Sequence, residues 1–305
     1  MELKVVDKTT IAIDTVRIRL ADADGAPLPG FQAGAHIEVS IRGLNRRYSL
    51  TSSPKTVDHY EICVLRTTPS RGGSAYIHDI LSVGDTLDVT DPINAFPLSR
   101  DARHSVFIAG GIGITPFYSM MEALHHAGSS FELHYAARNQ NKALPIPHFA
   151  ERASLYVDKE GRSGLDIDVL LKTIVSRSDL YVCGPRRMIV DVREQALARG
   201  WPRAAIHAES FGAVQMPDDE PIKVVLAKSG MTIEVQPGQS ILDALLENDV
   251  WAVYECRRGE CASCVVQYTS GEPDYRDLCL TEEQRKSSLC TCVAWAKSAS
   301  LTLDI

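Results

Sequence analysis

The chain has 305 residues, of which 45% are hydrophobic and 23% are charged, and its formal net charge is −7. This length and composition predict a soluble globular protein of two or three domains. The negative charge argues against nucleic acid as a main partner, because phosphate binding needs a basic surface. No stretch approaches the ~20 apolar residues that span a bilayer, and the N-terminus lacks an apolar signal core. We therefore expect a cytoplasmic protein without a membrane partner.

The first region, residues 1–103, contains short β-rich runs separated by turns. The runs 36–41, 46–52 and 59–67 have the length and residue types of strands, and Pro-Gly, Gly-Asp and Asp-Pro pairs separate such segments. Strands at this spacing favour an antiparallel barrel, interrupted by one helix near residues 74–81.

The second region, residues 104–213, alternates strand-like and helix-like segments. This alternation predicts a parallel sheet with helices on both faces. The strand-like runs are residues 104–110, 131–138, 154–160, 179–185 and 204–211. Helices are expected after the first of these runs, at 116–128, and after the fourth, from 186 to about 199.

The third region begins after a polar, acidic and proline-containing segment, residues 214–221, which is a candidate linker. Residues 222–305 form the last predicted domain. It opens with two strand-like runs of hairpin type, 222–230 and 231–238, followed by a helix at 240–248. A group of cysteines then follows.

Six of the eight cysteines lie between Cys256 and Cys292, which in a reducing compartment indicates metal rather than disulfides. Cys256, Cys261 and Cys264 form a C-x4-C-x2-C pattern, the spacing of plant-type [2Fe–2S] proteins, which need one more distant cysteine. Small residues between them, including Gly259, let backbone N–H groups approach the sulfurs.

The fourth ligand is expected to be Cys292, with Cys290 as its rival and Cys279 as a weaker candidate. Spacing alone does not separate Cys290 from Cys292. The alternatives to a cluster are a zinc site or a set of buried free thiols. Zinc sites usually show paired C-x2-C motifs, and only one such motif is present here.

The chain resembles the phthalate dioxygenase reductase family, the reductase components of Rieske-type aromatic-ring oxygenases. The resemblance covers nearly the whole chain and rests on the segments R-x-Y-S, GGIGITP, CGP and C-x4-C-x2-C…C, together with the ending CVAWAKSASLTLDI. It implies a flavin-binding barrel, a nicotinamide-binding α/β domain and a C-terminal β-grasp-like ferredoxin domain. It also favours Cys292 over Cys290, because the last cluster cysteine of the family falls at that position.

Arg46, Tyr48 and Ser49 fit the R-x-Y-S pattern, with Arg47 at the variable position. A guanidinium can bind a phosphate bidentately, and a tyrosine ring can lie against the isoalloxazine. A serine hydroxyl can hydrogen-bond near N5, where a hydride arrives. The resemblance implies these three roles for Arg46, Tyr48 and Ser49, in that order.

Gly72, Gly73 and Ser74 open the helix expected in the barrel, with Ser74 as a natural N-cap. Free N–H groups at a helix start attract phosphate, although a capped helix without a ligand would look the same. With Arg46 upstream, we favour a phosphate site. The resemblance implies FMN rather than FAD.

Gly110, Gly111 and Gly113 follow an apolar strand, where glycines let the backbone approach a pyrophosphate closely. Pro116 suits the first turn of the following helix, and Thr115 is a candidate N-cap or phosphate contact. A proline stands where the third glycine of G-x-G-x-x-G would be, so the segment also fits a simple tight turn.

Cys183, Gly184 and Pro185 lie at the carboxyl end of another strand, where parallel sheets bind ligands. The resemblance places this segment beside the nicotinamide, with Cys183 near the reacting carbon; the alternative is a buried, inert thiol. Ser49 and Cys183 are thus the candidate catalytic residues.

The resemblance also places Phe211 near the flavin, although it could be ordinary core. Arg138 ends the second strand of this region, where an acidic residue would favour NADH and a basic residue could hold the 2′-phosphate of NADPH. The choice between the two cofactors stays open, and the family leans to NADH.

Together these features predict an NADH-dependent reductase that accepts hydride on FMN and passes single electrons through a [2Fe–2S] cluster to a Rieske-type terminal oxygenase. The alternatives are a different acceptor, such as a di-iron oxygenase or a free ferredoxin, and a redox-sensing protein without turnover. From residue 220 onward there are 13 acidic and 8 basic side chains, a net charge of −5. Arg257 and Arg258 could meet acidic groups of the oxygenase, or could be solvated surface charge.

Overall fold

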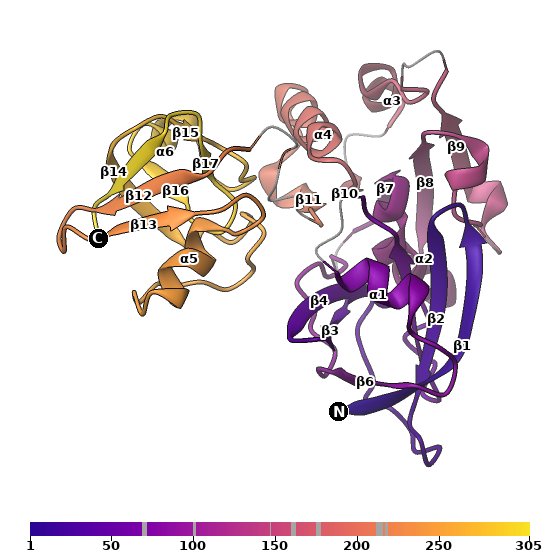
Figure 1. Cartoon of the computed structure of the whole chain (residues 1–305). Helices are drawn as coiled ribbons and strands as arrows, with labels where there is room; N and C mark the ends of the chain where they lie inside the picture. Colours follow the sequence, from indigo (N-terminus) through magenta and orange to yellow (C-terminus); the bar gives the residue numbers. More distant parts are fainter. Residues whose placement is uncertain are drawn as a thin grey trace. The chain divides into compact units, whose positions relative to one another are not determined.

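The computed structural model describes residues 1–68, 72–99, 102–146, 148–159, 163–174, 178–211, 216 and 219–305. These residues form two compact units, 1–209 and 210–305 (Figure 1). Each unit contains its own buried hydrophobic residues. Among the described residues, no helix has the length and apolar character needed to cross a membrane.

Six strands of the first unit form an antiparallel sheet in the order β4-β3-β6-β1-β2-β5. They are β1 (Glu2–Ala12), β2 (Thr15–Ala21), β3 (His36–Ile41), β4 (Leu44–Ser49), β5 (Tyr60–Leu65) and β6 (Thr86–Val89). A bridge from Leu50 to Ile62 joins the two ends of this order, so the sheet closes into a barrel. Alternating apolar residues such as Leu3 and Val5 fill its core, which confirms the predicted barrel. Helix α1 (Gly73–Asp79) lies between β5 and β6 in the chain.

Five further strands form a parallel sheet in the order β11-β10-β7-β8-β9. They are β7 (His104–Gly110), β8 (Ser130–Ala137), β9 (Ala153–Val157), β10 (Asp179–Cys183) and β11 (Ile206–Glu209). The connecting helices are α2 (Thr115–His126), α3 (Ile167–Thr173) and α4 (Arg186–Ala198), with short 3₁₀ turns η1 (Gly111–Ile114), η2 (Gln140–Lys142), η3 (Ala150–Arg152) and η4 (Arg203–Ala205). The chain runs outward from β7 to β9 and returns beside β7 as β10. The strand order therefore reverses between β7 and β10, and ligands of such sheets bind at this point.

The barrel and the parallel sheet share a core within the first unit. Phe107 and Phe117 pack with ring centroids 4.9 Å apart, and Phe96 from the segment after the barrel joins them. Gly34 of the barrel donates its N–H to Ser119 Oγ at 3.1 Å. A Cβ at Gly34 would lie 2.0 Å from the carbonyl oxygen of Phe96, and Gly34 has a φ of 89°, so this close backbone approach requires glycine.

The second unit contains a mixed sheet in the order β13-β12-β18-β14-β16. Its strands are β12 (Ile222–Leu226), β13 (Thr232–Val235), β14 (Val265–Ser270), β16 (Ser288–Cys290) and β18 (Ser300–Leu303), with β15 (Pro273–Asp274) pairing with β17 (Trp295–Ala296). Helix α5 (Ile241–Glu247) begins at a capping box of Ser240 and Asp243 and buries Ile241 and Leu245 in the core of the sheet; α6 (Glu282–Arg285) is a single turn. This arrangement confirms the β-grasp-like expectation.

The predicted linker, residues 214–221, lies partly outside the described residues. Its described residue Asp219 belongs to the second unit, where its carboxylate is 2.5 Å from the guanidinium of Arg276. Both side chains are nearly fully buried, and Asp274 also contacts Arg276. A buried charge needs such a partner, so this ion pair fixes the end of the linker segment to the ferredoxin-like sheet.

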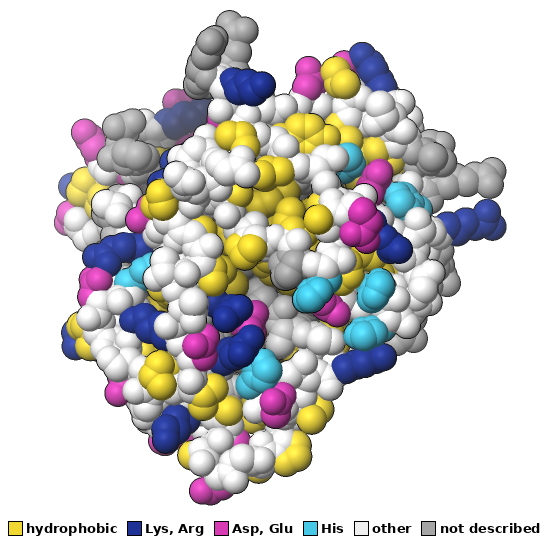
Figure 2. Space-filling model, turned by 90° about the vertical axis from the view of Figure 1, so that its right-hand side faces the viewer, with side chains coloured by type: hydrophobic (Ala, Val, Ile, Leu, Met, Phe, Trp, Pro, Cys, Tyr) yellow, Lys and Arg dark blue, Asp and Glu magenta, His cyan; other side chains and the backbone are white. Residues whose placement is uncertain are grey.

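One face of the molecule carries charged side chains of both signs, interspersed with histidines around a central group of hydrophobic side chains (Figure 2).

Candidate functional site

Strand β4 separates its two arginines onto opposite faces, because successive side chains in a strand alternate. Arg46 and Tyr48 share one face. Arg47 lies on the other, where its Nε is 2.6 Å from Glu38 Oε1 on the neighbouring strand β3. The variable position of R-x-Y-S is thus used for an ion pair within the barrel, and Arg46 and Tyr48 remain together.

The side chain of Arg46 lies against the start of α1. A Cβ built on Gly73 would be 3.0 Å from Arg46 Cγ and 3.1 Å from its Nε. Gly72 adopts a φ of 101°, a left-handed conformation that favours glycine, and the helix begins directly after it. The structure therefore brings together a guanidinium and a glycine turn that the sequence had placed 26 residues apart.

Ser74 is not the N-cap of this helix, so that prediction is wrong. Gly72 takes the N-cap position because its positive φ ends the preceding loop. Ser74 is the second residue of the helix and is buried, with its Oγ 2.9 Å from Thr67 Oγ1. Its hydroxyl therefore ties the helix to the end of β5.

Tyr48 and Ser49 are both partly or fully buried at the end of β4. Burial raises the pKa of Tyr48 to about 12, partly offset by the nearby charge of Arg46, so the phenol stays protonated at neutral pH. Ser49 is 6% exposed and pairs with His36 across the β3–β4 ladder. The three residues Arg46, Tyr48 and Ser49 thus all lie in the second half of strand β4.

The glycine loops after β7 and β10 pack backbone against backbone. A Cβ on Gly113 would lie 2.3 Å from the carbonyl oxygen of Cys183, and one on Gly184 would lie 2.9 Å from Gly110 Cα. A Cβ on Gly110 would lie 2.6 Å from Pro185 Cδ. These distances leave no room for a side chain. The structure therefore joins the two nicotinamide segments predicted from the sequence, at the point where the strand order reverses.

Thr115 does not cap α2, because Ile114 occupies the N-cap position and Thr115 is the first helical residue. Its hydroxyl donates to the carbonyl of Ile112 at 2.9 Å, which closes the 3₁₀ turn η1 instead. The predicted position of Pro116 in the first helical turn is confirmed. Cys183 is fully buried, and Gly111 adopts a φ of 55° with open space beside its Cα.

Replacing Gly113 by alanine should weaken nicotinamide binding. The added Cβ cannot avoid the backbone of Cys183, so the two loops must separate, at a cost of about 1–3 kcal/mol in folding free energy. We expect the Kd for NADH, measured by flavin-reduction titration, to rise about tenfold. Gly30→Ala is the matched control, because a Cβ there meets nothing within 4 Å. Equal NADH affinity in the two variants would contradict this assignment.

The cysteines predicted to bind iron converge in the second unit. The sulfurs of Cys264 and Cys292 are 3.1 Å apart. Hydrogen bonds from Cys290 and Cys292 lower the pKa of Cys264 to about 3, whereas the pKa of Cys292 is raised by its bond to Cys264. Cys256 and Cys261 also interact through their thiols, and Cys256 contributes to the raised pKa of Cys292, so these four side chains lie close together. Four cysteines gathered in this way suit a metal cluster, to which they would bind as thiolates.

The loop around Cys256 points backbone donors at sulfur. The N–H groups of Arg258 and Glu260 lie 3.3 and 3.5 Å from Cys256 Sγ. Arg257, Gly259 and Ala262 have φ values of 53°, 70° and 63°, left-handed conformations that turn the loop tightly. Such N–H···S bonds tune the reduction potential of an iron–sulfur cluster. These residues therefore fit a [2Fe–2S] cluster.

Gly259 is required by a contact that sequence reasoning missed. A Cβ there would lie 2.6 Å from Val293 Cγ2 and 2.9 Å from Asp277 Cα. The N–H of Leu278 donates to the carbonyl of Gly259 at 2.8 Å. The segment 277–280 therefore packs beneath the cluster loop. The full burial of Asp277 in this segment is seen only in the structure, and the sequence carried no signal for it.

The two arginines of the cluster loop already have acidic neighbours. Arg257 lies 2.9 Å from Asp243 and stacks over the ring of Tyr254, while Arg258 lies 3.3 Å from Glu260. These contacts compensate the positive charge that the sequence had suggested for partner binding.

Phe211 belongs to the second unit and is 42% exposed.

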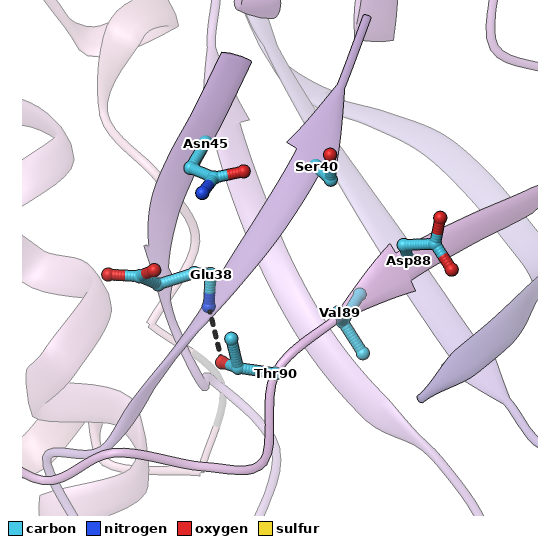
Figure 3. A pocket seen from close by; sticks show the side chains of 6 residues that line it. All are labelled: Glu38, Ser40, Asn45, Asp88, Val89 and Thr90. Carbon is cyan, nitrogen blue, oxygen red and sulfur yellow. Dashed lines mark hydrogen bonds between the residues drawn. The ribbon is translucent and has the colours of Figure 1, made fainter. Parts of the chain in front are cut away.

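A small pocket of about 180 Å³ lies on the face of the barrel opposite Arg46 (Figure 3). It is lined by Glu38, Ser40, Asn45, Asp88, Val89 and Thr90. The N–H of Glu38 donates to Thr90 Oγ1 at 3.0 Å. None of the six lining residues is basic, and the carboxylate of Glu38 is already paired with Arg47, so the lining offers no cation to hold a flavin phosphate.

The barrel, the glycine loops at the switch point and the convergent cysteines define an oxidoreductase that combines flavin, nicotinamide and [2Fe–2S] chemistry. Comparisons with known proteins agree. Residues 107–194 match the oxidoreductase NAD-binding domain, and residues 224–297 match the 2Fe-2S iron-sulfur cluster binding domain. The chain belongs to the phthalate dioxygenase reductase family.

Individual relatives match along almost their whole length. A solved structure of phthalate dioxygenase reductase is 34% identical, with a TM-score of 0.80, and the match covers 100% of this chain and 98% of that one. The phenoxybenzoate dioxygenase subunit beta of Ectopseudomonas oleovorans is 39% identical over 94% of this chain and 91% of its own. The heme-dependent oxidative N-demethylase beta subunit of Ectopseudomonas mendocina (strain ymp) is 36% identical over 93% and 92%.

Proposed function

We propose that this chain is the NADH-dependent reductase component of a Rieske-type oxygenase system. The observation that carries the proposal is the convergence of Cys256, Cys261, Cys264 and Cys292 in the same chain as the nicotinamide loops. Bound flavin supplies the exchange between a two-electron hydride and single electrons, and the cluster carries one electron at a time. No acid, base or nucleophile is needed, so the residues act by binding and orienting.

The flavin is held, in this proposal, by strand β4 and the start of α1. Arg46 binds the phosphate together with the backbone of Gly72 and Gly73, close to Ser74. Tyr48 lies against the flavin ring and Ser49 donates a hydrogen bond near N5. FMN is favoured over FAD on the family resemblance.

The nicotinamide cofactor is held at the reversal of strand order. Gly110, Gly111 and Gly113 receive its pyrophosphate, with Thr115 and Pro116 beginning the helix behind them. The segment at the end of β10 lies beside the nicotinamide ring; it consists of Cys183, Gly184 and Pro185. Phe211 is assigned to the surroundings of the flavin on the family resemblance alone. NADH is favoured over NADPH on the family resemblance.

The domain organisation proposed with this function keeps the boundaries drawn from the sequence. Residues 1–103 are the flavin domain, 104–213 the nicotinamide domain, 214–221 the linker and 222–305 the ferredoxin domain. The protein is proposed to act in the cytoplasm, where NADH is available and cysteines stay reduced.

The proposal is tested by the visible spectrum of the anaerobic protein before and after NADH. We expect flavin bands on a broad iron–sulfur absorption, both bleached by NADH and more slowly by NADPH, with FMN as the released flavin. If protein produced with sufficient iron shows flavin bands without iron–sulfur absorption, the cysteines would instead be assigned to a zinc site. Released FAD would remove the FMN assignment.

The acceptor requires its own experiment, because one relative is named as a subunit of a heme-dependent demethylase. A haem-containing acceptor is therefore the second candidate. Oxygenase components from the source organism should be mixed with the reductase and NADH without oxygen. A reduced Rieske signal in electron paramagnetic resonance supports the proposal, whereas faster reduction of a haem component overturns it.

A further inference from the structure

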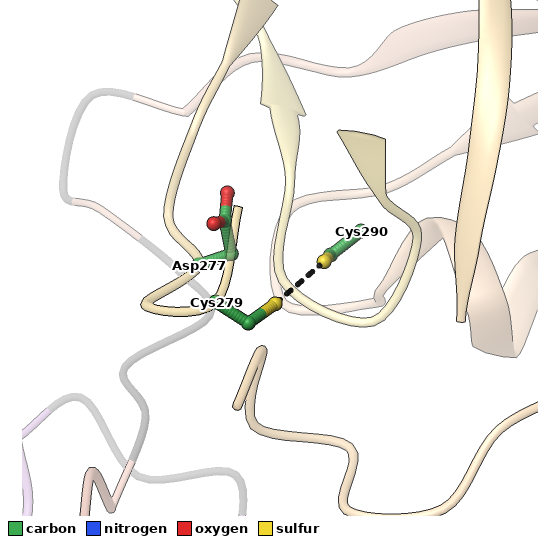
Figure 4. Close-up of side chains that lie close together, drawn as sticks. All are labelled: Asp277, Cys279 and Cys290. Atoms are coloured by element: carbon green, nitrogen blue, oxygen red, sulfur yellow. Dashed lines mark hydrogen bonds between the residues drawn. The ribbon is translucent and has the colours of Figure 1, made fainter. Parts of the chain in front are cut away.

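Two cysteines outside the proposed ligand set form a second thiol pair. The sulfurs of Cys279 and Cys290 lie 3.4 Å apart and point toward one another (Figure 4). They are eleven positions apart in the chain and come from different elements, the segment before α6 and strand β16. The fold, rather than the sequence spacing, therefore brings these two thiols into contact.

The two thiols differ in their access to solvent. Cys279 is partly exposed, whereas Cys290 is fully buried in a small core with Leu242, Leu280 and Val293. An oxidant from solution therefore meets Cys279 first. Cys290 is held in place behind it, because its backbone pairs with Val265 in the β14–β16 ladder.

We propose that Cys279 and Cys290 are a peroxide-sensitive dithiol that forms a reversible disulfide beside the cluster; this inference rests on the proposed ligand set ending in Cys292. Hydrogen peroxide is the oxidant, a product whenever a reductase loses two electrons to oxygen. The Cys279 thiolate attacks one peroxide oxygen, the O–O bond breaks, and one water leaves after protonation. Cys290 then attacks the resulting sulfenic acid, an S–S bond forms and a second water leaves. Overall, two thiols and one peroxide give one disulfide and two waters.

The disulfide would join two parts of the cluster site. Segment 277–280 already contacts the cluster loop, since Leu278 donates to Gly259 and Asp277 packs against it. Strand β16 leads into Cys292 two residues later. Oxidation would therefore fix segment 277–280 to the strand that leads into the last ligand, and would consume peroxide at a pair of thiols outside the proposed ligand set.

The test is disulfide mapping of the holoprotein after hydrogen peroxide, followed by alkylation and tryptic digestion. Cys279 falls in the peptide 277–285, and Cys290 falls with Cys292 in the peptide 287–297. We expect these two peptides to be cross-linked after peroxide and separated again by a thiol reductant. The cross-link should persist in Cys292→Ser and disappear in Cys279→Ser and Cys290→Ser. Cys63→Ala, which removes a thiol buried in the barrel, is the matched control and should leave it unchanged.

The visible spectrum of Cys279→Ser separates failure of this inference from failure of the proposed function. This variant should keep the iron–sulfur absorption and its bleaching by NADH. If it keeps both and the wild-type protein forms no cross-link, the dithiol inference is overturned while the reductase stands. If Cys279→Ser or Cys290→Ser loses the cluster, the pair supplies iron ligands and both the ligand set and the inference are wrong. Zinc bound by Asp277, Cys279 and Cys290, which also lie close enough to share an ion, would likewise overturn it.

Discussion

Replacing Cys292 by serine should abolish NADH-driven reduction of cytochrome c while NADH still reduces the flavin. The sulfur of Cys292 is 3.1 Å from that of Cys264 and accepts the N–H of Gly259, so it lies within the proposed ligand group. Changing a residue that only supports a metal ligand already costs about 10–100-fold in affinity or activity. Loss of a ligand itself should therefore lower cytochrome c reduction by at least about 100-fold.

The measurement compares two reactions in the same preparation. Anaerobic flavin bleaching by NADH reports the first unit, and steady-state cytochrome c reduction with the iron content reports the second. Cys290→Ser is the matched control, because Cys290 lies two residues away and is equally buried. It should retain iron and cytochrome c reduction. The reverse result, with a normal cluster in Cys292→Ser and none in Cys290→Ser, would move the fourth ligand to Cys290.

The strands and helices were largely predictable because their periodicity is strong. Strand β7 spans the predicted residues 104–110, and α4 begins at the predicted Arg186. Strand β7 is an almost continuous buried apolar run, whereas α4 buries Ile189, Val192 and Ala196 at helical spacing, so each pattern favours one kind of element. Strand β4 is less well predicted: it runs from Leu44 to Ser49, whereas the β-rich run suggested 46–52. Its end is set by the bridge at Leu50, which is a tertiary contact.

The errors arose where backbone conformation decides the outcome. Ser74 and Thr115 are good N-cap residues, but Gly72 and Ile114 occupy those positions, because a positive φ in one case and a 3₁₀ turn in the other begin the helix earlier. Hydroxyl residues in the first turn of a helix form other hydrogen bonds, and sequence alone does not distinguish such residues from N-caps.

The glycine loops illustrate a different limit. Their residue types suggested close approach to a pyrophosphate, and the structure adds that they must also approach each other, since Gly110 and Gly184 lie in contact. The contact joins segments that are 74 positions apart. The local spacing of residues does not indicate this contact between Gly110 and Gly184. It follows from the strand order, which places β10 next to β7.

Replacing Arg46 by alanine should release much of the bound flavin. Arg46 is the guanidinium against Gly73 at the start of α1, and a hydrogen bond from a charged donor is worth about 1.5–3 kcal/mol. Removing it should raise the Kd for FMN about 10–100-fold. The flavin content of the purified protein and a fluorescence titration of the apoprotein with FMN measure this directly.

Arg47→Ala is the control that makes the experiment specific, because Arg47 is the next residue of β4 and lies on the opposite face with Glu38. Its loss removes an ion pair of the barrel but no flavin contact, so FMN affinity should change by less than about threefold while the melting temperature falls slightly. Arg46→Lys separates charge from geometry, since lysine keeps the charge but not the bidentate fork. Equal loss of flavin in Arg46→Ala and Arg47→Ala would mean that strand β4 itself was disturbed. Unchanged FMN affinity in Arg46→Ala would remove the guanidinium from the site, and the start of α1 would then have no charged partner assigned to the phosphate.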